Sequence, residues 1–280
     1  DVFAVGAGDG ALRAARPDKG TAALHVYSPD VDPGSPAFDT PARPEGKPET
    51  MVEAINRTLK DEMAANPLIK GFTTNPTLMK KAGVTDYVAF AREMLAIVPD
   101  RPISFEVFSD DFSEMASQAL EIASWGSNVF VKIPVTNTAG TFAGPLIAAL
   151  SGRGVQLNVT ALLTVAQVEQ VAAVLSKEVA SYISVFAGRI ADTGIDPMPI
   201  MRQSLDLMRP LPKAELIWAS PRELLNVVQA DEVGCHVITA TSDVLAKLPL
   251  IGKDLAAFSL ETVKMFRQDA VSAGFSIAGR

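Results

Sequence analysis

The chain has 280 residues, of which 48% are hydrophobic and 20% charged, and its formal net charge at pH 7 is −7. This composition is typical of a globular protein with a large core, and it excludes a disordered or fibrous one. The acidic balance and the scattered Lys and Arg residues argue against nucleic acid as a partner.

Targeting and membrane signals are missing from the sequence as read. No apolar run reaches the roughly 18 residues that a membrane span needs, and we recognise no signal peptide. The one cysteine, Cys235, excludes a disulfide within the chain and reads as a small buried hydrophobe. We therefore expect a cytoplasmic protein with no membrane partner.

Residues 1–50 form an irregular N-terminal segment that is rich in Gly and Pro, and residues 28–48 read as loop at every position. The segment has two candidates for a first strand, VFAV (2–5) and AALHVY (22–27), and a helix is predicted over residues 49–64. Residues 2–30 superficially resemble a dinucleotide-binding fingerprint. The glycines at 6, 8 and 10 lack the G-x-G-x-x-G spacing, so we expect a turn and no cofactor.

From about residue 66 onward, short apolar stretches rich in β-branched residues alternate with segments of helical spacing. The predicted strands are LIKGFTT (68–74), PISFEVF (102–108), NVFVKIP (128–134), GVQLNVT (154–160), SYISVFA (181–187), AELIWAS (214–220) and CHVITAT (235–241). Helices are predicted between them, for example over residues 85–98, 111–125 and 164–176. This alternation favours a (β/α)8 barrel over residues 51–280 as a single domain, with an open doubly wound sheet as the alternative.

The C-terminal stretch FSLETVKMFRQDA (258–270) has the spacing of a further helix. We expect this helix to pack on the barrel or on a neighbouring subunit, and the protein to be a homo-oligomer.

A lysine interrupts the most apolar of these strands, NVFVKIP. Alternate residues of a strand point to opposite sides, so Lys132 faces away from its β-branched neighbours and toward the barrel interior. The same parity turns Glu106, Asn158, Thr160 and Ser184 to that interior, mostly near the C-terminal ends of their strands, where barrel enzymes build active sites. A structural ion pair between Lys132 and Glu106, or a lysine that reaches solvent, is the alternative, but the surrounding polar cluster favours a function.

A buried lysine suits one kind of chemistry in particular. A free lysine has a pKa near 10.4, so only about one molecule in a thousand is a neutral amine near pH 7.4. Burial disfavours the charged form and thereby makes the amine available for imine formation with a carbonyl substrate. The intermediate must then lose water, and Glu106 and Thr160 are suited to position and protonate that water.

Two further segments, AGRIADTG (187–194) and ASPRELLN (219–226), each place an arginine after a strand. Arg189 and Arg222, together with Ser220, would offer donors to a phosphate at the mouth of the barrel, with surface arginines as the less favoured alternative. A deep imine-forming lysine and a phosphate site together suggest a phosphorylated sugar as the substrate.

Over about residues 66–275 the sequence resembles the transaldolase family, in particular its smaller bacterial members. The resemblance rests on KGFTTNPTL (70–78), SFEVF (104–108), VFVKIPVT (129–136), LNVTALLT (157–164), ISVFAGRIADTG (183–194) and WASPRELLN (218–226), in the order and spacing of that family. It implies a Schiff-base enzyme of the pentose phosphate pathway that moves a dihydroxyacetone unit from a ketose phosphate to an aldose phosphate, without metal or cofactor.

The resemblance also implies a role for each candidate residue. Lys132 would form the Schiff base, and Glu106 and Thr160 would handle the catalytic water. Sugar hydroxyls would be contacted by Asn75, Asn158 and Ser184, and the phosphate would be held by Arg189, Ser220 and Arg222.

The first strand departs from the family pattern. Close relatives read I-F-A-D-G-A-D there and use the aspartate as acid and base, whereas VFAVGAG (2–8) places Val5 at that position. If residues 22–27 form the strand instead, Asp30 or Asp32 could take the role. Two alternatives therefore stay open beside a transaldolase, namely a stand-alone fructose-6-phosphate-type aldolase and a sugar-phosphate-binding barrel without turnover. Glu106 favours the transferase, because the similar aldolases usually carry glutamine there.

Overall fold

The computed structural model describes residues 2–6, 23–27, 69–81, 83–275 and 277. The chain divides into two compact units, Asp1–Leu245 and Ala246–Arg280. The second unit holds a short 3-10 helix, η1 (Leu248–Leu250), and the helix α12 (Leu255–Ser272), which confirms the predicted C-terminal helix. The helix predicted over residues 49–64 lies outside the described residues.

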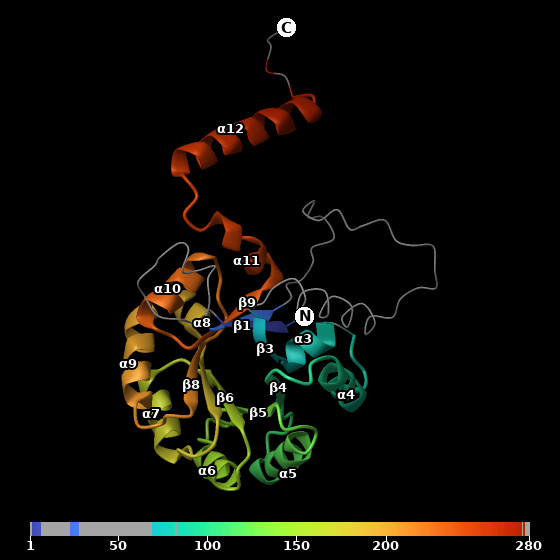
Figure 1. Cartoon of the computed structure of the whole chain (residues 1–280), viewed down its shortest axis with the longest axis vertical. Helices are drawn as coiled ribbons and strands as arrows, with labels where there is room; N and C mark the ends of the chain where they lie inside the picture. Colours follow the sequence, from blue (N-terminus) through green and yellow to red (C-terminus); the bar gives the residue numbers. More distant parts are fainter. Residues whose placement is uncertain (1, 7–22, 28–68, 82, 276, 278–280) are drawn as a thin grey trace. The chain divides into compact units, whose positions relative to one another are not determined.

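The first unit contains all seven strands predicted from residue 66 onward, and neighbouring strands run parallel in chain order (Figure 1). They are β3 (Ile69–Thr73), β4 (Ile103–Glu106), β5 (Val129–Pro134), β6 (Leu157–Leu162), β7 (Ser181–Val185), β8 (Ala214–Trp218) and β9 (Val237–Thr241). Together with two strands from the N-terminal segment, these seven strands form a closed barrel. The prediction of a (β/α)8 barrel is therefore confirmed, and the closed ring rules out the open sheet.

Both candidates for the first strand form strands, but in opposite directions. The strand β2 (Ala23–Tyr27) runs parallel to β9 and β3 and so completes a ring of parallel strands. The strand β1 (Val2–Gly6) runs antiparallel to β2, β3 and β9. Val5 therefore pairs with Ile69 at the start of β3, away from the C-terminal ends of the parallel strands. Asp30 and Asp32 lie outside the described residues.

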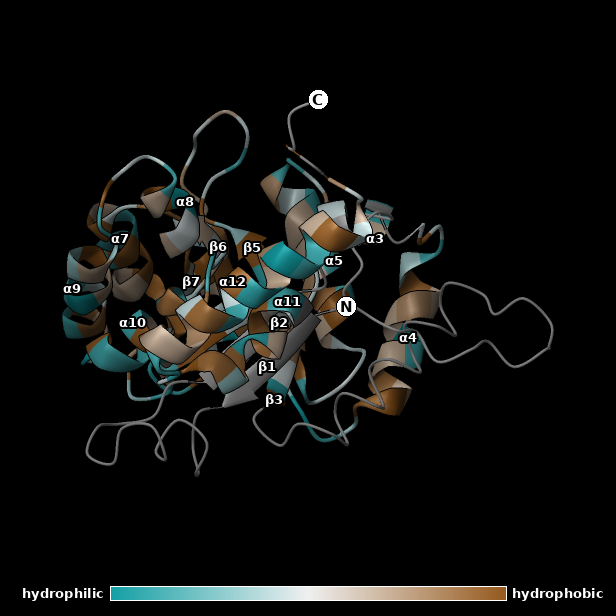
Figure 2. Ribbon diagram, turned by 90° about the horizontal axis from the view of Figure 1, so that it is seen from above, coloured by the Kyte–Doolittle hydropathy of each residue, from teal (hydrophilic) through white to brown (hydrophobic). Residues whose placement is uncertain are grey.

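Helices follow the parallel strands and cover the outside of the barrel. They are α3 (Pro76–Lys81), α4 (Tyr87–Ile97), α5 (Phe112–Ala123), α6 (Gly144–Gly152), α7 (Val165–Val174), α8 (Ala187–Ala191), α9 (Met198–Met208), α10 (Leu225–Val233) and α11 (Ser242–Ala246). The helices show polar and apolar residues side by side (Figure 2), as expected for elements with one face on the core. None of the described helices has both the length and the apolar character needed to cross a bilayer.

Local capping explains where the predicted helices begin. The carboxylates of Asp86 and Asp111 accept backbone N–H groups at the starts of α4 and α5. Thr164 and Gln167 form a reciprocal capping box at the start of α7. Each such cap contributes about 1 kcal/mol, so these boundaries are encoded locally.

The two faces of the strands have different tasks. In β5, the side chains of Val129, Val131 and Ile133 are buried on the face that packs against the helices. On the opposite face Phe130 contacts Tyr182, with ring centroids 4.5 Å apart, in a cluster that also contains Ile217. The barrel interior is therefore a packed core, and polar residues enter it only nearer the C-terminal ends of the strands.

Candidate active site

A cavity of about 450 Å³ lies at the C-terminal ends of the parallel strands. It is lined by most of the residues that the sequence analysis singled out: Asn75, Glu106, Lys132, Thr160, Arg189, Ser220 and Arg222. They come from six different strands or from the segments that follow them, which is how barrel enzymes assemble their sites. Asn158 and Ser184 do not line the cavity.

Lys132 lies at the wall of this cavity with only 4% of its side chain exposed. Its Nζ donates to the backbone carbonyl of Thr74 at 3.1 Å and lies 3.2 Å from Oε2 of Glu106, whose side chain is 15% exposed. The register of the sheet pairs Glu106 directly with Lys132 across β4 and β5. A buried ammonium is stable only with such partners, so the lysine is held in place rather than reaching out to solvent.

Two residues that line the cavity with Lys132 each have a buried oxygen without a hydrogen-bond partner in the described part of the chain. Among the described residues, neither Oγ1 of Thr160 nor Oε2 of Glu106 makes a hydrogen bond, although the latter is in ion-pair contact with the amine. A buried polar atom without a partner costs about 1–3 kcal/mol, and such atoms call for an explanation. Both residues line the cavity, so a ligand or a water held there would satisfy both oxygens.

Tyr87, at the start of α4, supports the two groups that hold Lys132. Its Oη accepts the backbone N–H of Glu106 at 3.0 Å and lies 3.4 Å from Oγ1 of Thr74. Burial raises the pKa of Tyr87 to about 12, so the phenol stays protonated at physiological pH. Its ring packs edge-on against Phe105 and Phe108. The helix thereby ties the ends of β3 and β4 together behind the lysine.

Asn158 and Ser184 belong to a hydrogen-bonded layer beneath the cavity. The Nδ2 group of Asn158 donates to Oγ of Ser104 at 2.9 Å, and Oγ of Ser184 donates to Oδ1 of Asn158 at 2.7 Å. All three side chains are buried. Each lies two residues before a residue that lines the cavity, and is therefore one step deeper on the same face of its strand. Their predicted contact with sugar hydroxyls stays a prediction.

The start of α8, which follows β7, and the loop after β8 approach each other closely at a glycine. The backbone N–H of Gly188 donates to the carbonyl of Ala219 at 3.2 Å. A Cβ atom on Gly188 would lie 1.4 Å from the carbonyl oxygen of Ser220, so no larger residue fits. Ser220 itself has a φ of 57°, a left-handed conformation that is costly for a residue other than glycine. This contact brings Arg189 and Arg222 to one part of the cavity.

The two arginines are held differently. The guanidinium of Arg189 lies 5.2 Å from the ring centroid of Phe186 and is otherwise exposed. Arg222 forms a two-pronged ion pair with Asp192: its Nε lies 3.0 and 3.1 Å from the two carboxylate oxygens, and its Nη2 donates to Oδ2. The hydrogen bonds from Arg222 lower the pKa of Asp192. Two guanidiniums against one carboxylate leave this part of the cavity positive, which suits an anionic group.

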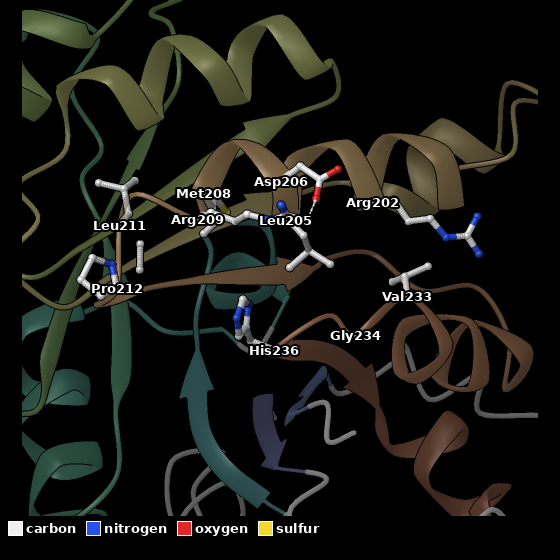
Figure 3. A pocket seen from close by; sticks show the side chains of 11 residues that line it. Arg202, Leu205, Asp206, Met208, Arg209, Leu211, Pro212, Val233, Gly234 and His236 are labelled. Carbon is white, nitrogen blue, oxygen red and sulfur yellow. Dashed lines mark hydrogen bonds and ion pairs between the residues drawn. The ribbon is translucent and has the colours of Figure 1, made fainter. Parts of the chain in front are cut away.

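A second cavity, of about 590 Å³, lies at the opposite end of the strands (Figure 3). It is lined by residues of α9 and by Ala214 and His236, which precede or begin β8 and β9. Nδ1 of His236 accepts the backbone N–H of Leu216 at 3.0 Å, and Asp206 pairs with Arg209. The described lining of this cavity contains no lysine, and the ring nitrogen Nδ1 of His236 is engaged with the backbone, so the smaller cavity around Lys132 is the better candidate for imine chemistry.

Asp192 and Tyr87 are site residues that the sequence analysis missed. Asp192 stands three positions after Arg189 in AGRIADTG, a spacing that puts both on one side of a helix and was the available signal. Tyr87 gave no signal, because its contacts cross from a helix to two strands. Among the described residues, no group of His, Cys, Asp or Glu side chains is arranged to hold a metal ion.

Comparison with known proteins agrees with this geometry. The family model described as Transaldolase/Fructose-6-phosphate aldolase matches residues 50–277. A protein named probable transaldolase from Dehalococcoides mccartyi is 33% identical over 195 residues, covering 68% of this chain and 87% of the relative. A second protein named probable transaldolase, from Desulforamulus reducens, is 36% identical over 222 residues, covering 77% of this chain and 98% of the relative. The chain therefore belongs to the transaldolase/fructose-6-phosphate aldolase family.

Proposed function

We propose that this protein is a transaldolase, which transfers a dihydroxyacetone unit from a ketose phosphate to an aldose phosphate through a Schiff base on Lys132. The observation that carries the proposal is the buried amine of Lys132 at the wall of a cavity, 3.2 Å from a carboxylate. The similar proteins named probable transaldolase support the same reaction.

The first half of the reaction joins the ketone to the lysine. The neutral amine of Lys132 attacks the carbonyl carbon, and the resulting carbinolamine loses its hydroxyl as water to leave an iminium ion. Glu106, as the acid, supplies the proton that lets the hydroxyl depart, and the hydroxyl of Thr160 holds the departing water. This role accounts for the two oxygens of the cavity lining that lack hydrogen-bond partners.

The second half breaks and remakes a carbon–carbon bond. A base removes the proton from the hydroxyl on the carbon beyond the breaking bond, the aldose phosphate departs, and the bonding electrons move to the iminium nitrogen as an enamine. The enamine then attacks the carbonyl carbon of the acceptor aldose phosphate, and hydrolysis of the new iminium frees the product and the lysine. Asp30 or Asp32 as this base stays a prediction, because both lie outside the described residues.

The phosphate group of the sugar binds beside Arg189, Ser220 and Arg222. A phosphate monoester carries about 1.5–2 negative charges at pH 7 and pairs well with arginine forks. These residues line the same cavity as Lys132, so one substrate can contact both groups. Asn75 also lines this cavity, and we assign it to a contact with a sugar hydroxyl.

Borohydride reduction in the presence of fructose 6-phosphate tests the proposal directly, because it converts an iminium into a stable amine. We expect a mass adduct on the peptide that contains Lys132 and its loss in Lys132→Met. The matched control is Lys213→Met, which removes an exposed lysine paired with Glu178 and should keep the adduct. The absence of an adduct on Lys132 in the unmodified protein would favour a binding barrel without turnover.

A rate measurement with an aldose-phosphate acceptor separates transfer from simple cleavage. A transaldolase makes the new ketose phosphate only when the acceptor is present, and releases little free dihydroxyacetone. Steady release of dihydroxyacetone without an acceptor would instead identify a stand-alone aldolase.

We also propose that the protein is a homo-oligomer. No residue of α12 is buried, and Leu260, Val263 and Phe266 are more than half exposed. A helix that exposes several large apolar side chains is typical of an interface with a partner. Light scattering after size exclusion should give a mass above one chain, and Leu260→Ser with Phe266→Ser should lower it. A mass of one chain for the unmodified protein contradicts the proposal.

A further inference from the structure

We propose that Asp192 is a positioning residue that orients the guanidinium of Arg222 for the phosphate of the substrate. The inference rests on the proposed function for the identity of the ligand. It assigns a task to a carboxylate that takes no part in the imine chemistry and yet lies against the phosphate-binding part of the cavity.

The geometry of the ion pair leaves part of Arg222 available. A guanidinium has five N–H donors in one plane, and those on Nε and Nη2 face the carboxylate of Asp192. Among the described residues, the guanidinium donates to Asp192, and Nη1 donates to none of them. A second anion can therefore approach the open edge of the same plane while Asp192 keeps its place.

Without Asp192 the side chain of Arg222 would have no fixed direction. Its backbone is already anchored, because the N–H of Arg222 donates to Oδ1 of Asn226 at 2.7 Å. The side chain beyond it is 49% exposed and has many rotamers, which a ligand would have to order on binding. The carboxylate selects one of these rotamers before the ligand arrives.

Asp192 also connects α8, which carries Arg189, with the loop that carries Arg222. It is the residue directly after α8, three positions beyond Arg189, and its partner Arg222 lies in the loop after β8. Two guanidiniums that line one cavity repel each other, and a carboxylate beside them offsets that repulsion in the free protein. Both side chains of the ion pair are half exposed, so the pair adds little to the stability of the fold. Its effect is to fix the direction of the Arg222 side chain.

Binding of inorganic phosphate, measured by titration calorimetry, tests the inference without any turnover. We expect Asp192→Asn and Asp192→Ala to bind phosphate about tenfold more weakly than the unmodified protein, as for the loss of a charge-assisted hydrogen bond. The control is Asp206→Asn, which makes the same charge change in an exposed Asp–Arg pair on α9 and should leave the affinity unchanged. Unchanged or tighter binding in Asp192→Ala, or no phosphate binding by the unmodified protein, overturns the inference.

Steady-state kinetics distinguish positioning from a general structural role. With a phosphorylated ketose, Asp192→Asn should raise KM about tenfold and change kcat less than twofold. Borohydride trapping of Lys132 by dihydroxyacetone, which has no phosphate, should proceed as in the unmodified protein. An equal loss with both ligands means that the cavity itself is damaged, and it refutes the positioning role. If the unmodified protein binds phosphate but forms no adduct on Lys132, the proposed reaction fails while the assignment of Asp192 stands.

Discussion

Substitution of Gly188 by alanine should separate α8 from the loop after β8, and so move Arg189 away from Arg222. The added Cβ would lie 1.4 Å from the carbonyl oxygen of Ser220 and 2.5 Å from its carbonyl carbon. Both atoms belong to the backbone, so no side-chain rotation relieves the overlap. The distance from this Cβ to the Ser220 oxygen must rise from 1.4 Å to a tolerable separation of about 3.0 Å, so the carbonyl must move by roughly 1.6 Å.

This displacement sets the size of the expected effect. Overpacking of this kind costs about 1–3 kcal/mol in stability, which leaves a well-formed barrel folded. Misplacement of a binding group by about 1 Å can lower the rate about a hundredfold. We therefore expect kcat/KM for phosphorylated substrates to fall by about two orders of magnitude, mainly through KM.

Gly152→Ala is the matched control, because a Cβ there meets nothing within 4 Å at the end of α6. That change should keep full activity and gain about 0.5–1 kcal/mol in stability. The assay compares kinetics, phosphate affinity and thermal midpoint for both variants. Gly188→Ala with wild-type kcat/KM and phosphate affinity would refute the reasoning, since α8 and the loop after β8 would then tolerate separation.

Three further changes have definite expected outcomes. Glu106→Gln should lower the rate of transfer at least about a hundredfold, as for loss of an acid–base group. A rate within about twofold of the unmodified protein contradicts the role of Glu106 as the acid. Asp30→Asn or Asp32→Asn should lower turnover about 10²–10⁴-fold while Lys132 is still trapped by borohydride, and normal turnover in both variants rejects them as the base. Burial raises the pKa of the fully buried Cys235 thiol to about 12, so an alkylating reagent at pH 8 should label it only after unfolding; rapid labelling of the native protein is the contrary result.

Several features of the cavity followed from the sequence because they depend on local periodicity. The alternation of residues along a strand is a property of the backbone, so parity alone turned Lys132, Glu106 and Thr160 to the interior. The sheet register places Lys132 beside Glu106 and the cavity lining contains all three. The buried Cys235 was also predicted correctly, and it followed from residue type.

Contacts between segments far apart in the chain were decided only by the tertiary structure. The alternation of residues tells which side of a strand a side chain faces, but not how deep in the barrel it lies. It therefore could not separate Asn158, which lies below the cavity, from Thr160, which lines it. Nor does the sequence state that Gly188 touches Ser220 or that Asp192 meets Arg222, 30 positions along the chain.

The directions of β1 and β2 were likewise decided by contacts between segments that lie far apart in the chain. The sequence by itself determined that VFAV and AALHVY are both fit to be strands, since strand propensity is local. Only the closed ring decided that β2 takes the parallel place and that β1 runs against it, because pairing with β3 and β9 is a long-range choice. The residue pattern thus determined which segments form strands and which side each strand residue faces. The depth of a side chain in the barrel, the directions of β1 and β2 and the pairing of charges were decided by how the strands close into a ring.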